Sequence, residues 1–184
     1  MSSSYFELQP KNLNNDLIRL VPLKISDFEF LYSVASDPEI WAQHPNKNRC
    51  ERSVFQNFFK GAMESGGAFL IQDQNKEAIG SSRFYDFKPK ESAVHIGYTF
   101  LAKKYWGKGY NRALKSLMLN HAFKYVDKVI FHVGSNNIPS QKAMNKLGAI
   151  KTGEIEVAYY GEPIRKNFIY EITKKEWDNI IDIT

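Results

Sequence analysis

Two glycines flank a lysine directly before a segment with helical periodicity, a pattern that can bind phosphate. Gly107, Lys108 and Gly109 follow a predicted strand and precede a run of apolar residues at helical spacing. Such a turn points several backbone N–H groups in one direction, with the positive end of the helix dipole behind them. A diphosphate is a suitable ligand for this arrangement. For the glycine pattern alone, a structural turn without a ligand is the alternative.

Spacing excludes two common nucleotide-binding motifs. A Walker loop requires Gly-x-x-x-x-Gly-Lys-Ser/Thr, whereas these glycines stand two apart and Tyr110 follows them. The dinucleotide-binding fingerprint requires a third glycine where this chain has Arg112. The turn therefore belongs to neither motif, and a phosphate bound there would belong to another kind of ligand.

A second segment, one strand further on, changes the interpretation of the turn. Asn137-Ile138-Pro139-Ser140 precedes a short predicted helix that begins at Pro139 and ends at Gly148. Together with the glycine turn, it resembles the second acetyl-CoA segment of the GCN5-related N-acetyltransferases (GNAT superfamily). The resemblance extends over IGSSRFYDF, VHIGYTFLAKKYWGKGYNRALKSLMLNHAF, NNIPSQKAMNKLGAIKTGE and NFIYEITKKEW. These segments are similar to the RimJ/RimL-like branch, whose characterised members acetylate protein N-termini.

The resemblance implies acetyl-CoA as the acyl donor. Backbone groups of Phe100 and Leu101 would pair with the pantetheine arm. Amides of residues 106–112 would hold the pyrophosphate, and Asn137 would anchor the arm from the other side. The implied cofactor-binding residues are Phe100, Leu101, Trp106, Gly107, Lys108, Gly109, Tyr110, Asn111, Arg112 and Asn137. Asn111 stands where relatives usually have glycine or alanine, and its amide would either add a donor or weaken binding. Helix capping is the alternative role for Asn137.

Two residues are implied to act in catalysis. An amine attacks a thioester only when it is neutral, so a base is useful, although less so for an α-amino group than for a lysine. His95 stands where relatives often place a glutamate base, and its alternative role is a strand histidine bonded to a neighbour. Ser140 is the candidate donor to the departing thiolate, because Met144 occupies the position of the usual tyrosine. Its alternative role is helix capping, and a strand amide near Phe100 would meet the oxyanion.

The resemblance also implies which residues would contact the acceptor amine, from their positions in the chain. Four residues fall in regions that line the acceptor cleft in relatives, with packing as their alternative role: Trp41, His44, Arg83 and Tyr160. Core positions are expected for His121 and His132. The four histidines lack paired spacing, so no metal site is predicted.

A framework of alternating strands and helices must position these residues. Hydrophobic periodicity predicts helices from Ser26, over 52–63, after the glycine turn, from Pro139 and after Thr173. Ser26 with Glu29, and Thr173 with Glu176, have capping-box spacing. Strands are expected at 17–23, 68–73, 77–87, 92–102 and 128–133, and as a hairpin within 154–172. The expected class is α/β (α+β), a mixed sheet between helices. The resemblance adds a largely antiparallel GNAT sheet in which two parallel strands splay apart to form the acetyl-CoA slot.

Strand 92–102 carries the implied base. Alternation predicts His95, Gly97 and Thr99 on one face, and the other face is formed by Val94, Ile96, Tyr98 and Phe100. A glycine within a strand often marks a bulge or a close approach by another group, so an irregularity is expected near Gly97.

Bulk properties limit the function classes. The 184 residues suit a single domain over 17–184, which we expect to follow a loose leader over 1–16. One cysteine, Cys50, excludes an internal disulfide. Because the net charge of +5 is dispersed, nucleic acid is not an expected partner, and neither a signal sequence nor a membrane span is evident. We expect a cytoplasmic enzyme, as a monomer or a homodimer.

The resemblance therefore implies an acetyl-CoA-dependent N-acetyltransferase that modifies a protein N-terminus. Two alternatives are open: an enzyme for small amines or amino-acid derivatives, and a CoA-binding module without catalytic activity.

Overall fold

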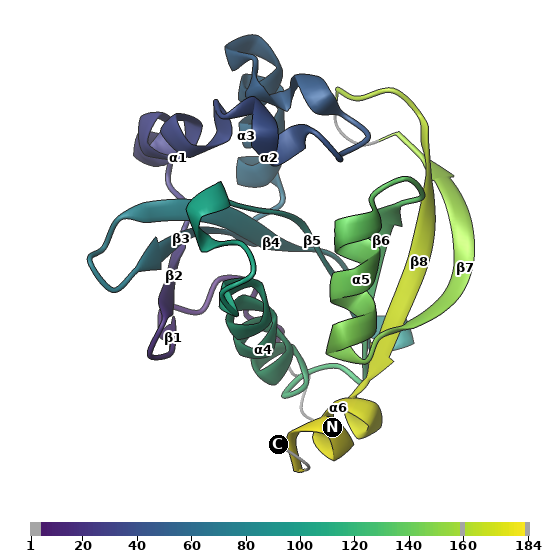
Figure 1. Ribbon diagram of the computed structural model, residues 1–184. Helices are drawn as coiled ribbons and strands as arrows, with labels where there is room; N and C mark the ends of the chain where they lie inside the picture. Colours follow the sequence, from purple (N-terminus) through teal and green to yellow (C-terminus); the bar gives the residue numbers. More distant parts are fainter. Residues whose placement is uncertain (1–4, 159–160, 183–184) are drawn as a thin grey trace.

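An eight-stranded sheet forms the centre of the computed structural model, which describes residues 5–158 and 161–182 (Figure 1). The strand order is β1-β2-β3-β4-β5-β6-β8-β7. Within these described ranges only β5 and β6 pair in parallel, and the other neighbouring strands are antiparallel. The strands are β1 (Leu13–Asn14), β2 (Ile18–Pro22), β3 (Ala68–Asp73), β4 (Ala78–Lys88), β5 (Ala93–Leu101), β6 (Lys128–Gly134), β7 (Ile150–Val157) and β8 (Arg165–Thr173). The mixed, mostly antiparallel sheet predicted from the sequence is confirmed.

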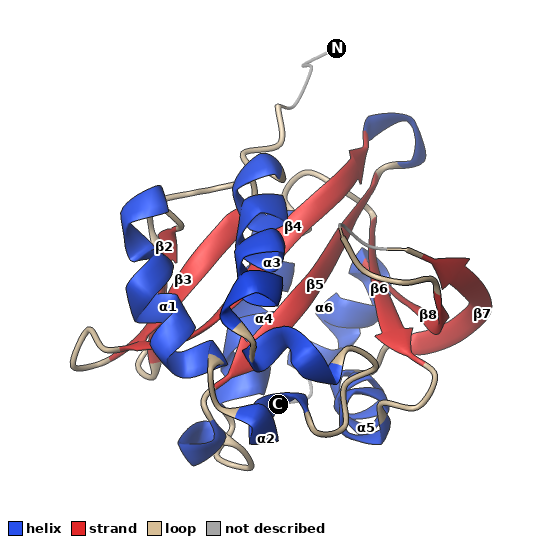
Figure 2. Cartoon of the chain, turned by 90° about the horizontal axis from the view of Figure 1, so that it is seen from above, coloured by secondary structure: helices blue, strands red, loops and turns tan. Residues whose placement is uncertain are grey.

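Helices cover both faces of the sheet (Figure 2). On one face, α1 and α3 cross the strands and enclose an aromatic-rich cluster around Phe55, Phe58 and Phe100. On the other face, α4 and α5 bury a larger cluster around Leu114, Met118 and Ile96. Within the described residues, no helix is long and apolar enough to cross a bilayer. The helices are α1 (Phe28–Ala35), α2 (Pro38–Trp41), α3 (Arg52–Glu64), α4 (Tyr110–Ala122), α5 (Ile138–Leu147) and α6 (Lys174–Asp182), with short 3₁₀ turns at Ile25–Asp27, Lys47–Cys50, Pro89–Glu91 and Lys103–Tyr105.

Residues 5–16 pack against the sheet rather than forming the loose leader we expected. Phe6 is only 3% exposed and belongs to the α4-side core, where its ring stacks on that of His121. The His121 Nε2 atom lies 2.7 Å from the carbonyl oxygen of Glu7, and β1 pairs with β2. Aromatic burial therefore holds this segment, a contact between distant parts of the chain that hydrophobic periodicity does not reveal.

The capping box predicted at Ser26 and Glu29 is wrong. The helix is preceded by a 3₁₀ turn, and the Asp27 carboxylate accepts a hydrogen bond from the Lys24 backbone N–H at 2.8 Å. Glu29 instead pairs with Arg52 of α3 on the surface. The side-chain cap is therefore one-sided and lies in the 3₁₀ turn before α1, where the Asp27 N–H donates to the Lys24 backbone carbonyl.

Two other helix ends agree with the sequence. Thr173 Oγ1 accepts from the Glu176 backbone N–H at 3.3 Å, and the Glu176 carboxylate accepts from the Thr173 N–H at 2.7 Å. Gly148 ends α5 in the left-handed conformation, with φ of 87°. The helix begins at Ile138, one residue before the predicted Pro139.

Candidate active site

The site begins where the two parallel strands part. Pairing between β5 and β6 is limited to residues 93–95 with 128–130, although β5 continues to Leu101 and β6 to Gly134. Beyond that point β6 stays paired with β8 and β5 with β4, so a gap opens between them. A cavity of about 790 Å³ lies there, lined by both strands, the segment around α2 and the N-terminal ends of α4 and α5.

A bulge distorts β5 inside this cavity. The register with β4 shifts between Ser81↔Phe100 and Arg83↔Gly97, so that Tyr98 and Thr99 face a single residue of β4. Tyr98 has φ of 53°, a conformation that costs a non-glycine residue of order 1–3 kcal/mol. Strain of this kind persists where the surroundings enforce it, and it clusters at functional sites. The irregularity expected near Gly97 is confirmed.

The bulge also overturns the predicted faces of this strand. Val94 and Ile96 pack into the α4-side core, as expected for neighbours in an alternating strand. Past the bulge, Phe100 and Tyr98 lie in the opposite cluster beneath α1 and α3. Thr99, predicted to share a face with the implied base, instead bonds to a side chain of α4. The extra residue reverses the alternation, which strict period-two counting cannot anticipate.

The glycine turn enters α4 with its backbone accessible. Gly107 and Gly109 have φ of 71° and 82°, and Gly109 is the N-cap of the 13-residue helix α4. A Cβ atom added to either glycine would meet no atom within 4 Å. The positive end of the helix therefore faces open space at the mouth of the cavity, which is the arrangement that suits a bound anion.

Nearly all the predicted cofactor-binding residues line this cavity. The exposed Trp106 donates its indole N–H to the Leu101 carbonyl at 2.9 Å, which joins the turn to the end of β5. Lys108 is not among the lining residues. Those that do line it are Phe100, Leu101, Trp106, Gly107, Gly109, Tyr110, Asn111, Arg112 and Asn137.

The N-terminal end of α5 forms the opposite wall. Asn137 is the N-cap, and its side-chain oxygen accepts from the Ser140 backbone N–H at 3.2 Å. The capping role considered for Ser140 is thus performed by Asn137. Ser140 lines the cavity, and Met144 lies one turn further along the same wall. The Ser140 hydroxyl is therefore available for a ligand in the part of the chain that the structure describes.

A pair of histidines lies beside the strand gap. His95 is 3% exposed and is not among the lining residues, whereas His132 of β6 is. Their ring centroids are 4.9 Å apart, and the His95 Nδ1 atom lies 3.4 Å from an Asp86 carboxylate oxygen. Burial lowers the pKa of both rings, that of His132 to about 4 with a further contribution from His95. Both imidazoles are therefore neutral at pH 7, and each is a weaker base than a free imidazole.

The far end of the cavity carries the predicted acceptor residues Trp41 and His44. Burial and the nearby Arg49 guanidinium lower the pKa of His44 to about 2. Arg83 lies outside the lining, 3.4 Å from the centre of the Tyr98 ring, and burial lowers its pKa to about 10. The fourth predicted residue, Tyr160, lies outside the described residues.

An ion pair that sequence reasoning missed lies at this end, where Arg49 lines the cavity. Arg49 is bidentate to Glu162 of the β7–β8 loop, at 2.5 and 2.7 Å, and Asn46 also donates to that carboxylate. The two charged side chains are 4% and 8% exposed. Their separation of more than a hundred residues leaves no sequence signal for the pair.

Lys115 was also missed, although a signal exists. It lines the cavity at 4% exposure, three and seven residues before the buried Met118 and Ala122. That spacing places it on the inward face of α4. Lys115 could therefore have been identified from the sequence as a charged residue on the apolar face of the helix.

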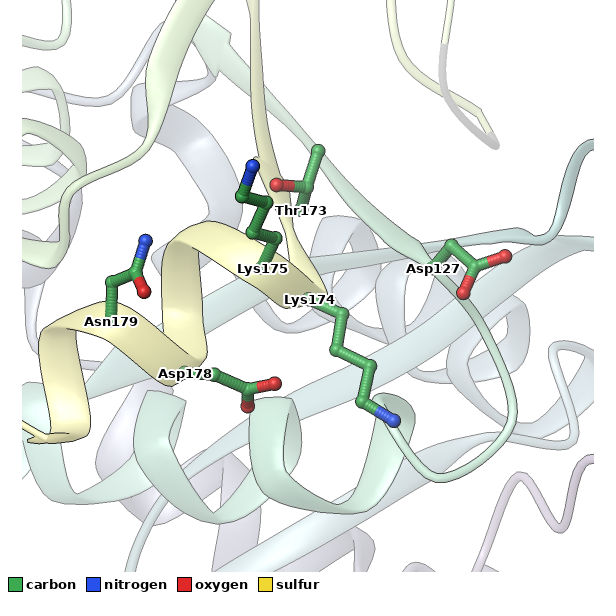
Figure 3. A pocket seen from close by; sticks show the side chains of 6 residues that line it. All are labelled: Asp127, Thr173, Lys174, Lys175, Asp178 and Asn179. Carbon is green, nitrogen blue, oxygen red and sulfur yellow. The ribbon is translucent and has the colours of Figure 1, made fainter.

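A second depression, of about 560 Å³, lies beside α6 (Figure 3). Its labelled side chains point in different directions and do not converge on a common point. Within the described residues its lining contains neither a histidine nor a buried charged group, so we assign no chemistry to it. It is lined by Asp127, Thr173, Lys174, Lys175, Asp178 and Asn179.

The histidines predict a loss of stability in mild acid. The pKa of each of the four is lowered, chiefly by burial. Between the unfolded pKa of about 6.5 and the lower folded values, the unfolded chain binds more protons, so stability falls as pH falls below 6.5. We expect the melting temperature to be lower at pH 5 than at pH 7.

The double substitution His44→Gln and His132→Gln should reduce this difference, because it removes the two largest shifts. Glu29→Gln is the control: it changes an exposed carboxylate that titrates at lower pH. Equal wild-type melting temperatures at pH 5 and pH 7 would contradict the assignment.

Comparison with known proteins supplies the family. The profile of the acetyltransferase (GNAT) domain matches residues 18–150. A solved structure of a predicted acetyltransferase is 25% identical, with TM-score 0.79 over 93% of this chain and 90% of that one. Spermidine N-acetyltransferase from Vibrio cholerae, solved with CoA and spermine, is 16% identical, with TM-score 0.68 over 90% of this chain and 100% of that one. Mycobacterium smegmatis RimJ, solved with CoA-disulfide, is 15% identical, with TM-score 0.72 over 95% and 97%.

Proposed function

The chain belongs to the GNAT acetyltransferase family and is an N-acetyltransferase, and from this premise we propose that its acceptor is a protein N-terminal α-amino group. The reaction would take place in the cytoplasm, with acetyl-CoA as the acyl donor. The observation that carries the choice of acceptor is the charge of the cavity wall.

The wall offers little attraction to a polycation. Among the described lining residues, Glu39 is the only carboxylate, and it is paired with Lys103. A polyamine carries several positive charges and would require several acidic partners, whereas an N-terminal amine is a single charge with a pKa of about 8. The basic lining residues are Arg49, Arg112, Lys115, Lys142, Lys146 and Arg165. The wall therefore favours a peptide terminus over spermidine.

The residues present fit acetyl-CoA. The accessible amides of the Gly107–Gly109 turn and the α4 N-terminus would hold the pyrophosphate, with Arg112 and Lys142 beside them. Beyond residue 95, the edge of β5 that is no longer paired with β6 would pair with the pantetheine arm as an additional strand would. When bound, acetyl-CoA supplies an acetyl group activated as a thioester. Asn111 lies in the wall of the same turn, where its amide can act as a further donor.

We assign the proton transfers to the neutral histidines and to Ser140. The implied base His95 does not line the cavity, so it would receive the proton of the acceptor amine by way of His132, which lines the cavity and contacts the His95 ring. The Ser140 hydroxyl donates a proton to the departing thiolate of CoA. Backbone N–H groups of β5 near Phe100, beyond the strained Tyr98, supply donors where negative charge develops on the acyl oxygen.

Two alternatives predict different behaviour in one assay. Peptides with a free N-terminus, spermidine and free amino acids would each be mixed with acetyl-CoA, and the site of acetylation located by mass spectrometry. We expect acetyl groups on the peptide α-amine. Faster acetylation of spermidine or a free amino acid would replace the proposed acceptor, and acetyl-CoA binding without any product would indicate a non-catalytic CoA-binding module.

A further inference from the structure

A lysine is buried in the wall of the cavity, with no charged partner among the residues that the structure describes. Lys115 is 4% exposed, and burial alone lowers its pKa to about 7, with no contribution from a charged group among the described residues. Desolvating an ammonium group destabilises the folded state, and an aliphatic residue at this place would avoid that cost. The position therefore requires an explanation other than stability.

Lys115 begins a chain of hydrogen bonds that ends on the bulge. Its Nζ lies 2.6 Å from Thr99 Oγ1, which lies 2.8 Å from Ser82 Oγ, and this second hydroxyl lies 3.4 Å from the Gly97 carbonyl oxygen. A carbonyl can only accept, so the Ser82 hydroxyl donates to Gly97 and accepts from Thr99. The Thr99 hydroxyl in turn accepts from Lys115, so the direction of the chain is fixed whether the amine is charged or neutral.

Holding the Gly97 carbonyl holds the backbone of the bulge. A peptide unit is planar, so an anchored carbonyl also fixes the N–H of Tyr98 on its opposite side. Tyr98 has the positive φ that relaxation of the strand would remove. Gly97, Tyr98 and Thr99 all line the cavity at the end of the strand gap. Side chains from α4, β5 and β4 therefore converge to maintain one strained stretch of backbone.

We propose that Lys115 is a positioning residue for acyl transfer, which through Thr99 and Ser82 holds the β5 bulge in the shape that receives the acyl group. The inference rests on the proposed function, in which the cavity holds the acetyl thioester. Preorganised backbone donors give a large part of the rate only when they are held in place before the reaction. The cost of burying Lys115 is thus offset by function rather than by stability.

The test combines turnover with the stability of the ligand-free protein. Lys115→Met should lower kcat by about 10- to 100-fold, less than the loss for a donor that touches the reacting atoms. The KM for acetyl-CoA should change less than about threefold, because the substitution does not alter the phosphate cradle. The melting temperature without ligand should rise or stay constant, because a desolvated amine is replaced by an apolar group of similar length.

Two further variants make the test specific. Thr99→Val removes the next link and should lower kcat by a similar factor, and Lys115→Met combined with Thr99→Val should be no worse than either alone. Lys124→Met, the same substitution at an exposed position just beyond α4, is the control and should leave kcat unchanged.

Three results would overturn the inference. These are an unchanged kcat in Lys115→Met, a fall in its melting temperature that accompanies the loss of activity, or additive losses in the double variant. A different result would contradict the proposed function: a wild-type protein that gains no thermal stability from acetyl-CoA and forms no product. A wild-type protein that binds and reacts, beside an unimpaired Lys115→Met, overturns the role of Lys115 alone.

Discussion

Gly109→Glu is expected to abolish acetyl-CoA binding while the protein stays folded. The substitution places a carboxylate at the N-terminus of α4, where the cofactor phosphates would otherwise lie. Two unit charges 4 Å apart repel by about 4 kcal/mol at the effective dielectric near a protein surface, which corresponds to roughly a 10³-fold loss of affinity. The thermal stabilisation that the wild-type protein gains from saturating acetyl-CoA should therefore disappear.

Two controls separate charge from strain. Gly66→Glu introduces the same residue at another left-handed glycine, with φ of 63° and no atom within 4 Å of the added Cβ, away from the cavity. It should lower stability by a similar amount and retain the acetyl-CoA shift. Gly109→Asn should retain much of the binding, because asparagine tolerates the left-handed conformation and carries no charge. An unchanged acetyl-CoA affinity in Gly109→Glu would show that this turn is not the phosphate cradle.

Arg49→Met is expected to produce the largest loss of stability. It would leave the nearly buried Glu162 carboxylate without its bidentate partner, and breaking a buried pair in this way costs about 3–5 kcal/mol. For a chain of this size, that corresponds to a fall in melting temperature on the order of 10 °C. The β7–β8 loop should also detach from the 3₁₀ turn at Lys47–Cys50, which would open the acceptor end of the cavity.

The matched control is Arg52→Met. Arg52 pairs with Glu29 on the surface, where both side chains are about half exposed or more, and such pairs contribute about 0–1 kcal/mol. Adding Glu162→Gln to Arg49→Met should restore part of the lost stability, because the unpaired charge is then removed. Equal effects of Arg49→Met and Arg52→Met, measured by thermal unfolding, would contradict the buried pair.

Local signals explain why much of the framework was predictable. The glycine turn, the Thr173–Glu176 capping box and the Gly148 helix end depend on residues within a few positions of one another. The parallel strand pair was inferred from family resemblance rather than from periodicity, and the pairing of β5 with β6 confirms it. Turns, caps and helix ends that depend on neighbouring residues could therefore be predicted from the sequence.

The site was harder to predict because it depends on contacts between distant residues. The Arg49–Glu162 pair joins two loops, and His132 gains its place beside the cavity only because β5 and β6 diverge. An irregularity was predicted near Gly97, but the strand faces were predicted as if the alternation of side chains continued past it. Lys115 was hidden among apolar neighbours whose spacing could have identified it. The roles of His95 and Ser140 stay predictions.

The most direct test of acetyl transfer by this cavity is the release of free CoA thiol. Purified protein would be mixed with acetyl-CoA and either of two peptides of one sequence, the first with a free N-terminus and the second with a blocked one, both lacking lysine. We predict thiol release with the free peptide, loss of that release in Gly109→Glu, and only the background rate with the blocked peptide. Equal release with both peptides, or none with either across a range of N-terminal residues, would contradict N-terminal acetylation by this protein.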